Sequence, residues 1–504
     1  MTDRLGKTNQ ARSLEEMARA ALNRDPSWPI VEYEQRWYTY GELRHVTARL
    51  KVLLAESAAP DSAPIAFAPR NRPSALAALL GLIAEGKTVQ MVYAFQSPAG
   101  LARDLLRLHP AVFIAAPQDL SEEVLDAARG AGIAVFALSD MEVKAVSGLE
   151  HVDPNAHDAT APSPPRIEIL TSGTTGPPKQ FPIPFELVAN YLSGGRLMFS
   201  SHGAALSQMP PVLLFFPLGN ITGIYSTVPT LILGQRIILL DRFSLDGWRD
   251  HLRRFQPAQS GMPPSCIRMI LDADIPASEL RCLKSLGTGA APLDPSVHRA
   301  FEERYNIPIL LAYGATEFGG RVAAMTLDLH SHWGAQKFGS VGRPVAGAKI
   351  RVVDPESLSP LPAGQEGLLE VVSPHMGDDW IRTTDLGVID EDGFLFLHGR
   401  ADGAITRGGF KILPETIERA LLTHPAVAAA AVVGVPDRRL GQTPAAAIQL
   451  KAGVEPPSIA ELDAHLRQRV LATHVPGHYR FVAELPKNPS MKVHRPAVAA
   501  LFST

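Results

Sequence analysis

The sequence predicts an α/β protein with a large N-terminal domain of parallel βαβ sheets, which includes a small β-subdomain, followed by a small α+β module. Short apolar strands alternate with helices from residue 65 onward, a pattern typical of parallel βαβ units. After Gly339 the predicted strands are short, alternating and separated by turn signals, which indicates the β-subdomain. The separate α+β module begins near Gly403.

The composition is that of an ordinary globular protein with several domains. Its 504 residues suffice for two to four domains, and 46% hydrophobic with 20% charged residues is usual for soluble proteins. The net charge of −3 favours neither nucleic acid nor an acidic membrane surface as a partner. Scattered histidines and only two cysteines argue against zinc sites and disulfides, so we expect Cys266 and Cys282 to be buried.

The N-terminus lacks an apolar segment of signal-peptide length, and no apolar run is long enough to span a bilayer. We therefore expect a cytoplasmic protein without a membrane span, present as a monomer or homodimer.

The expected elements of the N-terminal part follow from apolar periodicity. Residues 13–23 predict an amphipathic helix, because their apolar residues recur at helical spacing. A strand at 37–40 and a helix at 41–54 follow. Strands and helices then alternate, with strands at 65–68, 88–92 and 111–115 and helices at 73–84, 101–108 and 121–129.

The later elements are more widely spaced. A Pro-, Asp- and Ser-rich linker at 151–166 leads into a strand at 167–170. Further strands are expected at 212–216, 236–240, 309–312, 349–353, 367–372 and 394–398. The C-terminal module is expected to contain helices at 415–422, 458–470 and 496–501 and strands at 426–433 and 480–485.

The most concentrated chemistry lies directly after the strand at 167–170. Hydroxyl and glycine residues run from 171 to 176, and two prolines and a lysine follow. Hydroxyls, exposed backbone N–H groups and a lysine suit a polyphosphate, and the carboxyl end of a parallel strand is where ligands bind. The alternative is a flexible Ser/Thr/Gly turn. The candidate ligands are Thr171, Ser172, Gly173, Thr174, Thr175, Gly176 and Lys179. The spacing is not that of a Walker A loop.

Two short motifs downstream suit a nucleotide. Residues 287–292 (Gly-Thr-Gly-Ala-Ala-Pro) form a small-residue turn against which a flat ring could lie, although alone they also fit a plain loop. Residues 313–317 (Tyr-Gly-Ala-Thr-Glu), expected just after a strand, combine an aromatic ring, a hydroxyl and a carboxylate. These groups could stack on a base, bind a phosphate and hold magnesium, or could form an ordinary turn.

Two further motifs lie nearer the C-terminus. Residues 380–385 (Trp-Ile-Arg-Thr-Thr-Asp) end in Asp385, whose carboxylate could accept from both ribose hydroxyls, and Gly-Arg-Ala-Asp-Gly follows at 399–403. Residues 486–495 place Lys492 in a proline-bounded loop, where a lone lysine is usually solvated.

Together these motifs resemble the adenylate-forming enzymes: acyl- and aryl-CoA ligases, stand-alone peptide-synthetase adenylation domains and firefly luciferase. The loop at 171–180 fits the family pattern TSGTTGxPKG at nine of ten positions and departs at Gln180. Residues 313–317 fit YGxTE, 380–385 fit W-x-RTGD with Thr384 in place of glycine, and 399–402 fit GRxD. Lys492 stands where the family has its C-terminal lysine, although Met491 replaces the usual glycine.

The resemblance implies a two-step reaction with ATP, Mg²⁺ and coenzyme A. A carboxylate attacks the α-phosphorus of ATP to give an acyl-adenylate, and a thiol then expels AMP. The loop would grip the β- and γ-phosphates, Thr316 the α-phosphate and Glu317 the metal. Tyr313 and Gly314 would face the adenine beside Gly289, Ala290 and Ala291, and Asp385 and Arg400 would hold the ribose. Lys492 would bridge the two reacting anions.

The resemblance also implies domain movement. The small C-terminal domain, residues 402–504, would rotate against residues 1–401 about Asp402 between the two steps. Gly408 and Gly409 would then line the tunnel for the pantetheine arm.

The acid itself is the least readable part. Gly219 and Asn220 stand where the family often has an aromatic–His pair, and no acidic residue between 213 and 233 could hold a substrate ammonium. With Ile224, Gly287 and Ala315 the expected pocket is neutral, which favours a hydrophobic fatty or aryl acid. Arg268 or Arg321 could instead pair with a second carboxylate. The thiol acceptor is CoA or a carrier protein, and a nucleotide-binding protein with weak turnover is the remaining alternative.

Overall fold

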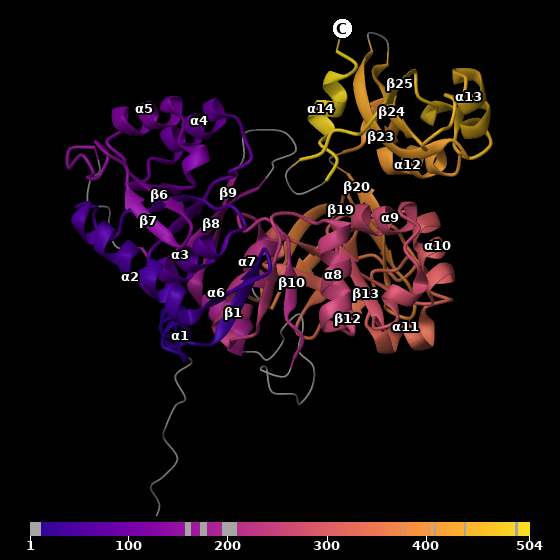
Figure 1. Ribbon diagram of the computed structural model, residues 1–504. Helices are drawn as coiled ribbons and strands as arrows, with labels where there is room; N and C mark the ends of the chain where they lie inside the picture. The colour runs from indigo at the N-terminus through magenta and orange to yellow at the C-terminus, as the bar shows by residue number, and fades with distance from the viewer. Residues whose placement is uncertain are drawn as a thin grey trace, which may run out of the picture. The chain divides into compact units, whose positions relative to one another are not determined.

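The computed structural model describes residues 12–156, 163–171, 179–193, 209–374, 376–401, 403–407, 410–437, 440–488 and 492–503. The chain divides into two compact units, Met1–Pro257 and Ala258–Thr504 (Figure 1). The expected domain boundary near Asp402 falls inside the second unit and stays a prediction. Among the described residues, no helix combines the length and apolarity needed to cross a membrane.

The first unit is built on a seven-stranded sheet with the order β7-β6-β5-β3-β4-β8-β9. Its five central strands run parallel, and β7 and β9 pair antiparallel at the two edges. The strands are β3 (Ile65–Ala68), β4 (Val89–Met91), β5 (Val112–Ala115), β6 (Ala134–Ser139), β7 (Glu142–Ala145), β8 (Arg166–Thr171) and β9 (Lys179–Pro184).

Helices cover both faces of this sheet, because its parallel strands are apolar on both sides. Ile65 and Phe67 of β3 enter one core, and the alternating Ala66 and Ala68 enter the other. The helices α1 (Leu14–Leu22), α2 (Tyr40–Glu56) and α3 (Pro73–Ala84) contribute to the first core, as do α6 (Phe185–Ser193) and α7 (Ile221–Leu233). Two helices pack on the second core, α4 (Pro98–Leu108) and α5 (Glu122–Gly130) (Figure 1).

Helix α3 is buried along its whole length, as expected for a helix that is apolar on every side. The remaining elements of the unit form a second, four-stranded sheet, β10-β11-β1-β2, and three further helices. They are β1 (Pro29–Tyr33), β2 (Arg36–Thr39), α6 (Phe185–Ser193), β10 (Val212–Leu214), α7 (Ile221–Leu233), β11 (Ile237–Leu239) and α8 (Leu245–Phe255).

The second unit begins with a five-stranded sheet in which β12, β13 and β14 are parallel and β15 and β16 antiparallel. Its elements are β12 (Gln259–Gly261), α9 (Pro264–Asp272), β13 (Ser285–Gly289), α10 (Pro295–Tyr305), β14 (Ile309–Ala315), β15 (Gly320–Ala324), α11 (Leu327–Trp333) and β16 (Arg343–Pro344). An antiparallel four-stranded sheet follows, formed by β17 (Lys349–Val353), β18 (Gly367–Val372), β19 (Ile381–Ile389) and β20 (Leu395–Arg400).

The last part of the second unit forms a sheet flanked by helices. Its strands are β21 (Ile405–Arg407), β22 (Phe410–Ile412), β23 (Val427–Asp437), β24 (Gly441–Leu450) and β25 (His478–Val482). Its helices are α12 (Pro414–Leu422), α13 (Ile459–Arg467) and α14 (Arg495–Ala500).

The predicted fold class is confirmed, with three local corrections. Strand β14 continues to Ala315, so Tyr313 lies inside a strand and not after it. Cys282 is only partly buried, unlike Cys266. The strand β8 is followed by the antiparallel strand β9, so the glycine-rich loop connects a hairpin.

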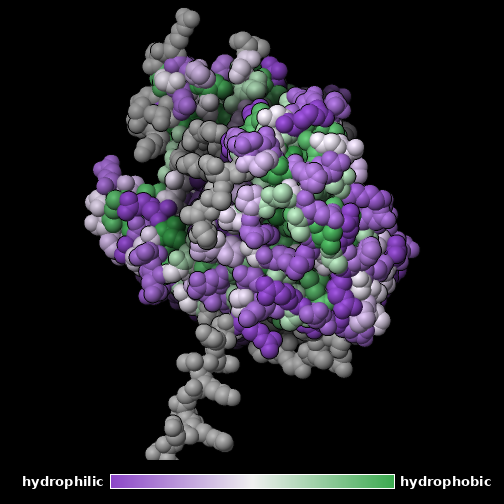
Figure 2. Space-filling view, turned by 90° about the vertical axis from the view of Figure 1, so that its left-hand side faces the viewer, coloured by the Kyte–Doolittle hydropathy of each residue, from purple (hydrophilic) through white to green (hydrophobic). Residues whose placement is uncertain are grey.

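On the face that Figure 2 shows, hydrophilic side chains (purple) are interspersed with smaller hydrophobic areas (green). This mixture matches the balanced composition of the chain.

Candidate active site

The glycine-rich loop is placed by its two ends. The backbones of Thr171 and Lys179 pair directly across the β8–β9 hairpin, and Gln180 is exposed on β9. Ser172, Gly173, Thr174, Thr175 and Gly176 lie outside the described residues, as do Asp402, Gly408, Gly409 and Met491. Their assigned roles stay predictions.

Strands β13 and β14 and the turn after β13 carry the small residues that are expected to contact the nucleotide and the acid. Gly289 lies so close to β14 that a Cβ there would be 2.8 Å from the carbonyl oxygen of Ala312. At Gly287 a Cβ would lie 3.8 Å from the carbonyl oxygen of Ser260, an ordinary contact that leaves room for a small side chain. Ala290 follows with a φ of 66°, an uncommon conformation for a residue other than glycine. The neighbouring Ala291 is exposed.

Tyr313 and Asp385 form the centre of the site. The Tyr313 hydroxyl donates a hydrogen bond to Oδ2 of Asp385, which joins β14 to β19. The Tyr313 ring is 7% exposed and packs edge-to-face on Phe318, with centroids 5.7 Å apart. Burial, and then the negative Asp385, raise the pKa of Tyr313, so its hydroxyl stays protonated as a donor. The adenine stacking expected of Tyr313 stays a prediction.

Asp385 has contacts within its own strand, through its backbone, and with the next strand, through its carboxylate. The Asp385 backbone N–H donates to Oγ1 of Thr383 (2.9 Å), and Nε of Arg400 lies 4.0 Å from Oδ1 of Asp385. Arg400 also donates from Nη2 to Oγ1 of Thr384 (2.6 Å). Thr384 stands where the W-x-RTGD pattern has glycine, and its hydroxyl orients Arg400. The motifs do not indicate this role. Asp385 and Arg400 face each other in register.

Glu317 is presented by a short 3₁₀ turn, Thr316–Phe318, directly after β14. Phe318 is buried, and its carbonyl oxygen accepts a hydrogen bond from the hydroxyl of Ser373, so the turn is anchored. Thr316 is partly exposed and Glu317 is exposed. One carboxylate beside substrate phosphates is the usual protein contribution to a Mg²⁺ site. The described residues contain no cluster of three or more His, Cys, Asp or Glu side chains suited to a metal. The donor set therefore fits Mg²⁺ shared with phosphate oxygens.

Lys492 lies within electrostatic range of Glu317 and Asp385. It is carried by a hairpin in which Oδ1 of Asn488 accepts from the Lys492 N–H (2.9 Å) and Pro486 O accepts from the His494 N–H (2.8 Å). Although the residue is exposed overall, surrounding protein atoms lower the pKa of Lys492 from its usual 10.5. The charge of Arg400 acts in the same direction, whereas Glu317 and Asp385 oppose it. The structure thus brings Tyr313, Asp385 and Arg400 together, with Glu317 and Lys492 within electrostatic range of each other.

The residues expected to line the acid pocket in the first unit have structural contacts of their own. Asn220 caps helix α7, its Oδ1 accepting from the Gly223 N–H (2.7 Å). Ile224 is fully buried in the apolar core, and Gly219 is buried. In the second unit, Ala315 is partly exposed at the end of β14. Arg268 pairs with Asp294 (3.2 Å).

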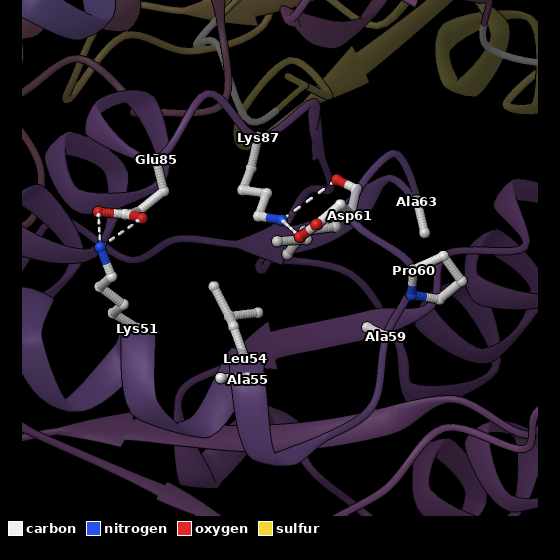
Figure 3. A pocket seen from close by; sticks show the side chains of 10 residues that line it. Lys51, Leu54, Ala55, Ala59, Pro60, Asp61, Ala63, Glu85 and Lys87 are labelled. Carbon is white, nitrogen blue, oxygen red and sulfur yellow. Dashed lines mark hydrogen bonds and ion pairs between the residues drawn. The ribbon is translucent and has the colours of Figure 1, made fainter. Parts of the chain in front are cut away.

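A hollow of about 320 Å³ lies in the first unit at the end of α2. Figure 3 shows its two ion pairs, Lys51–Glu85 (3.0 Å) and Lys87–Asp61 (3.0 Å), around an apolar lining. None of the predicted site residues lines this hollow, and its charges are paired with each other.

The chain belongs to the AMP-binding enzyme family: residues 18–378 match the AMP-binding enzyme model and residues 416–492 match the model of its C-terminal domain. The resemblance inferred from the motifs is confirmed.

Two curated relatives and one solved structure extend this result. The chain is 32% identical to a sulfoacetate–CoA ligase of Cupriavidus necator, with 83% of each chain covered. It is 29% identical to a 2-succinylbenzoate–CoA ligase of Bacillus licheniformis, over 65% of this chain and 68% of that one. The ATP-bound crystal structure of MatB from Rhodopseudomonas palustris has the same fold, with a TM-score of 0.79, 22% identity, and 97% and 99% of the two chains covered.

Proposed function

We propose that the protein is an ATP-dependent acid–thiol ligase that converts a carboxylic acid through an acyl-adenylate into an acyl-CoA thioester. The polar cluster of Tyr313, Asp385 and Arg400, in a chain that matches the AMP-binding enzyme model, carries this proposal. The cations Lys492 and Arg400 supply the positive charge that is needed to bring anionic reactants together. The CoA ligases among the relatives, one of them aligned over 83% of this chain, support the same reaction class.

In the first step, a carboxylate oxygen of the acid attacks the α-phosphorus and the bond to pyrophosphate breaks. Lys492 neutralises charge on the acid and the α-phosphate, and Thr316 donates a hydrogen bond to the α-phosphate. Asp385, held by Tyr313, accepts from the ribose hydroxyls. Mg²⁺, when bound at Glu317, supplies charge neutralisation for the departing pyrophosphate.

In the second step, the sulfur of a thiol attacks the acyl carbonyl and AMP leaves. We propose that residues 402–504 rotate about Asp402 between the steps, which removes Lys492 and brings Gly408 and Gly409 to the pantetheine arm. Asp402→Pro fixes φ at the hinge and should spare adenylate formation while blocking thioester formation. Equal loss of both half-reactions would contradict the hinge.

For the acid, we propose a hydrophobic fatty or aryl acid, as the neutral residues Gly219, Asn220, Gly287 and Ala315 suggest. The absence of an acidic residue from 213 to 233 supports the exclusion of amino acids.

A specific observation favours a second candidate, an acid with a second anionic group. Arg321 of β15 lies in register with Gly314, is exposed, and makes no ion pair within the part of the chain that the structure describes. The named substrates of the two relatives, sulfoacetate and 2-succinylbenzoate, each carry two acidic groups.

The test is a pyrophosphate-release screen over fatty, aryl, dicarboxylic and sulfonated acids, with CoA, with a phosphopantetheinylated carrier protein, and with neither thiol. AMP release that requires free CoA supports the ligase proposal. Release that requires the carrier protein instead identifies a carrier-loading enzyme. Absence of adenylate with every acid would overturn the ligase proposal.

A further inference from the structure

Glu415 has no part in the chemistry proposed above, yet its carboxylate contacts two separated segments of the second unit. It lies in the first turn of α12. Its Oε1 accepts a hydrogen bond from Nη2 of Arg495 at 3.0 Å. Its Oε2 faces Gly399 of β20, where a Cβ atom would lie only 2.8 Å from this oxygen. Glu415 therefore joins the segment that follows Lys492 to the strand that ends at Arg400.

The contact with β20 depends on glycine. Gly399 has a φ of 136°, a backbone conformation that side chains disfavour, and any Cβ would strike the carboxylate. The next residue, Arg400, bonds Thr384 and faces Asp385. The close approach of Glu415 therefore occurs one residue away from the ribose-binding pair.

The contact with Arg495 leads to the lysine. Arg495 is the first residue of α14 and stands three residues after Lys492. Its guanidinium donates to Oε1 of Glu418 (2.9 Å) as well as to Glu415, so it fastens the Lys492 hairpin to α12. Glu418 itself bonds the Val432 N–H (2.8 Å) within the same sheet-and-helix layer. Of the three residues Arg495, Glu418 and Glu415, it is Glu415 that reaches β20.

One oxygen of the Glu415 carboxylate lacks a hydrogen-bond donor in the described ranges of the chain. Oε2 of Glu415 is buried and has no hydrogen-bond partner among the described residues. Burial raises the pKa of Glu415, and Glu418 acts in the same direction, whereas Arg495 lowers it. A buried oxygen without a donor makes the contact weak, so it can be released.

We propose that Glu415 is a positioning residue that seats α12 against Gly399 and thereby holds Lys492 beside Glu317 and Asp385 during acyl-adenylate formation. The inference rests on the proposed function, in which Lys492 serves only the first half-reaction. Glu415 touches no reacting atom and acts through Lys492. Its loss should therefore impair adenylation and spare thioester formation.

The first test measures the two half-reactions separately in Glu415→Ala. Pyrophosphate exchange should fall about tenfold, the scale of one lost hydrogen bond to a charged group, while thioester formation from supplied acyl-adenylate stays within about twofold. The matched control is Glu455→Ala, an exposed acidic residue of the same module, which should leave both rates unchanged. Equal loss of both half-reactions would reduce Glu415 to a structural role, and no loss in either would also overturn the proposal.

The second test does not need activity. Carbodiimide forms an amide between a lysine and an adjacent carboxylate, and peptide mapping can quantify coupling of Lys492 to Glu317 or Asp385. The wild-type protein and Glu455→Ala should give this product, and Glu415→Ala should give several-fold less. Unchanged coupling in Glu415→Ala, or no coupling in the wild type, would overturn the positioning role. If the wild type couples but forms no adenylate with any acid, only the proposed function fails.

Discussion

The interior of the seven-stranded sheet and the polar cluster around Asp385 are held together by different kinds of interaction. Along β3, successive side chains enter two apolar cores, and every residue of α3 is buried. Around Asp385 the contacts are single polar ones: a tyrosine hydroxyl, an arginine at 4.0 Å, and a lysine on an exposed hairpin.

The difference has a physical consequence. Apolar burial is large and non-directional, so many small contributions resist any separation of strand and helix. A polar contact adds only about 1 kcal/mol net and fails when its geometry changes. The first region is suited to stay fixed, and the second is suited to rearrange between two half-reactions.

The largest loss of stability is expected when a side chain is removed from the interior of the seven-stranded sheet. Phe67→Ala deletes a fully buried ring of the central strand β3 and should cost about 3–5 kcal/mol of unfolding free energy. Denaturant unfolding measures this loss. Val52→Ala, at a residue that is 44% exposed on α2, should change stability by less than about 0.5 kcal/mol. Equal losses of unfolding free energy in the two variants would show that burial in the sheet interior does not provide the stability assigned to it.

In the polar cluster around Asp385, Lys492→Ala should reduce adenylation by at least ~100-fold, the scale for loss of one preorganised charge donor. Pyrophosphate exchange reports this step. Because the residue is exposed, the unfolding free energy should hardly change. Near-normal exchange in the variant would contradict the assigned role of Lys492.

A smaller effect is expected where the hydroxyl alone is removed. Tyr313→Phe leaves the ring packed on Phe318 but deprives Asp385 of its donor, so the KM for ATP should rise about tenfold. Tyr305→Phe is the matched control, because that hydroxyl donates to the carbonyl oxygen of Ile275 in another part of the unit. A change in kcat without a change in KM would argue against a role in holding the ribose.

The finest test uses pH. Because its surroundings lower the pKa of Lys492, its ammonium form is lost as the pH rises through a value below 10.5. Pyrophosphate exchange should therefore decline on the alkaline side at a lower pH than for a free lysine. Thioester formation from supplied acyl-adenylate should lack this decline, and its presence in both steps would exclude Lys492 as the cause.

The fold could be predicted where local pattern and tertiary structure agree. Strand β3 and helix α3 begin and end where the apolar run and Pro73 indicate. Helix α7 was missed, because Pro229 lies inside it and Asn220 was interpreted as a substrate residue. The signal was present, since Asn220 precedes an apolar run and is a good N-cap.

Sequence motifs indicate candidate site residues but not the contacts between them. Tyr313, Glu317, Asp385 and Lys492 are indicated because each residue type has its own chemistry, and their roles stay predictions. The hydroxyl of Thr384 on Arg400 and the approach of Glu415 to Gly399 depend on strand register and packing between distant segments. No spacing in the sequence encodes such distances.

The hairpin that carries the glycine-rich loop sets the reach of that loop. Thr171 and Lys179 are paired across β8 and β9, so the chain between them must leave and return at the same neck. Eight Cα steps of about 3.5 Å, folded back on themselves, extend no more than ~14 Å from that neck. A phosphate bound by backbone N–H groups of this segment must lie within about one hydrogen-bond length of this radius, so the hairpin limits where the phosphate can bind.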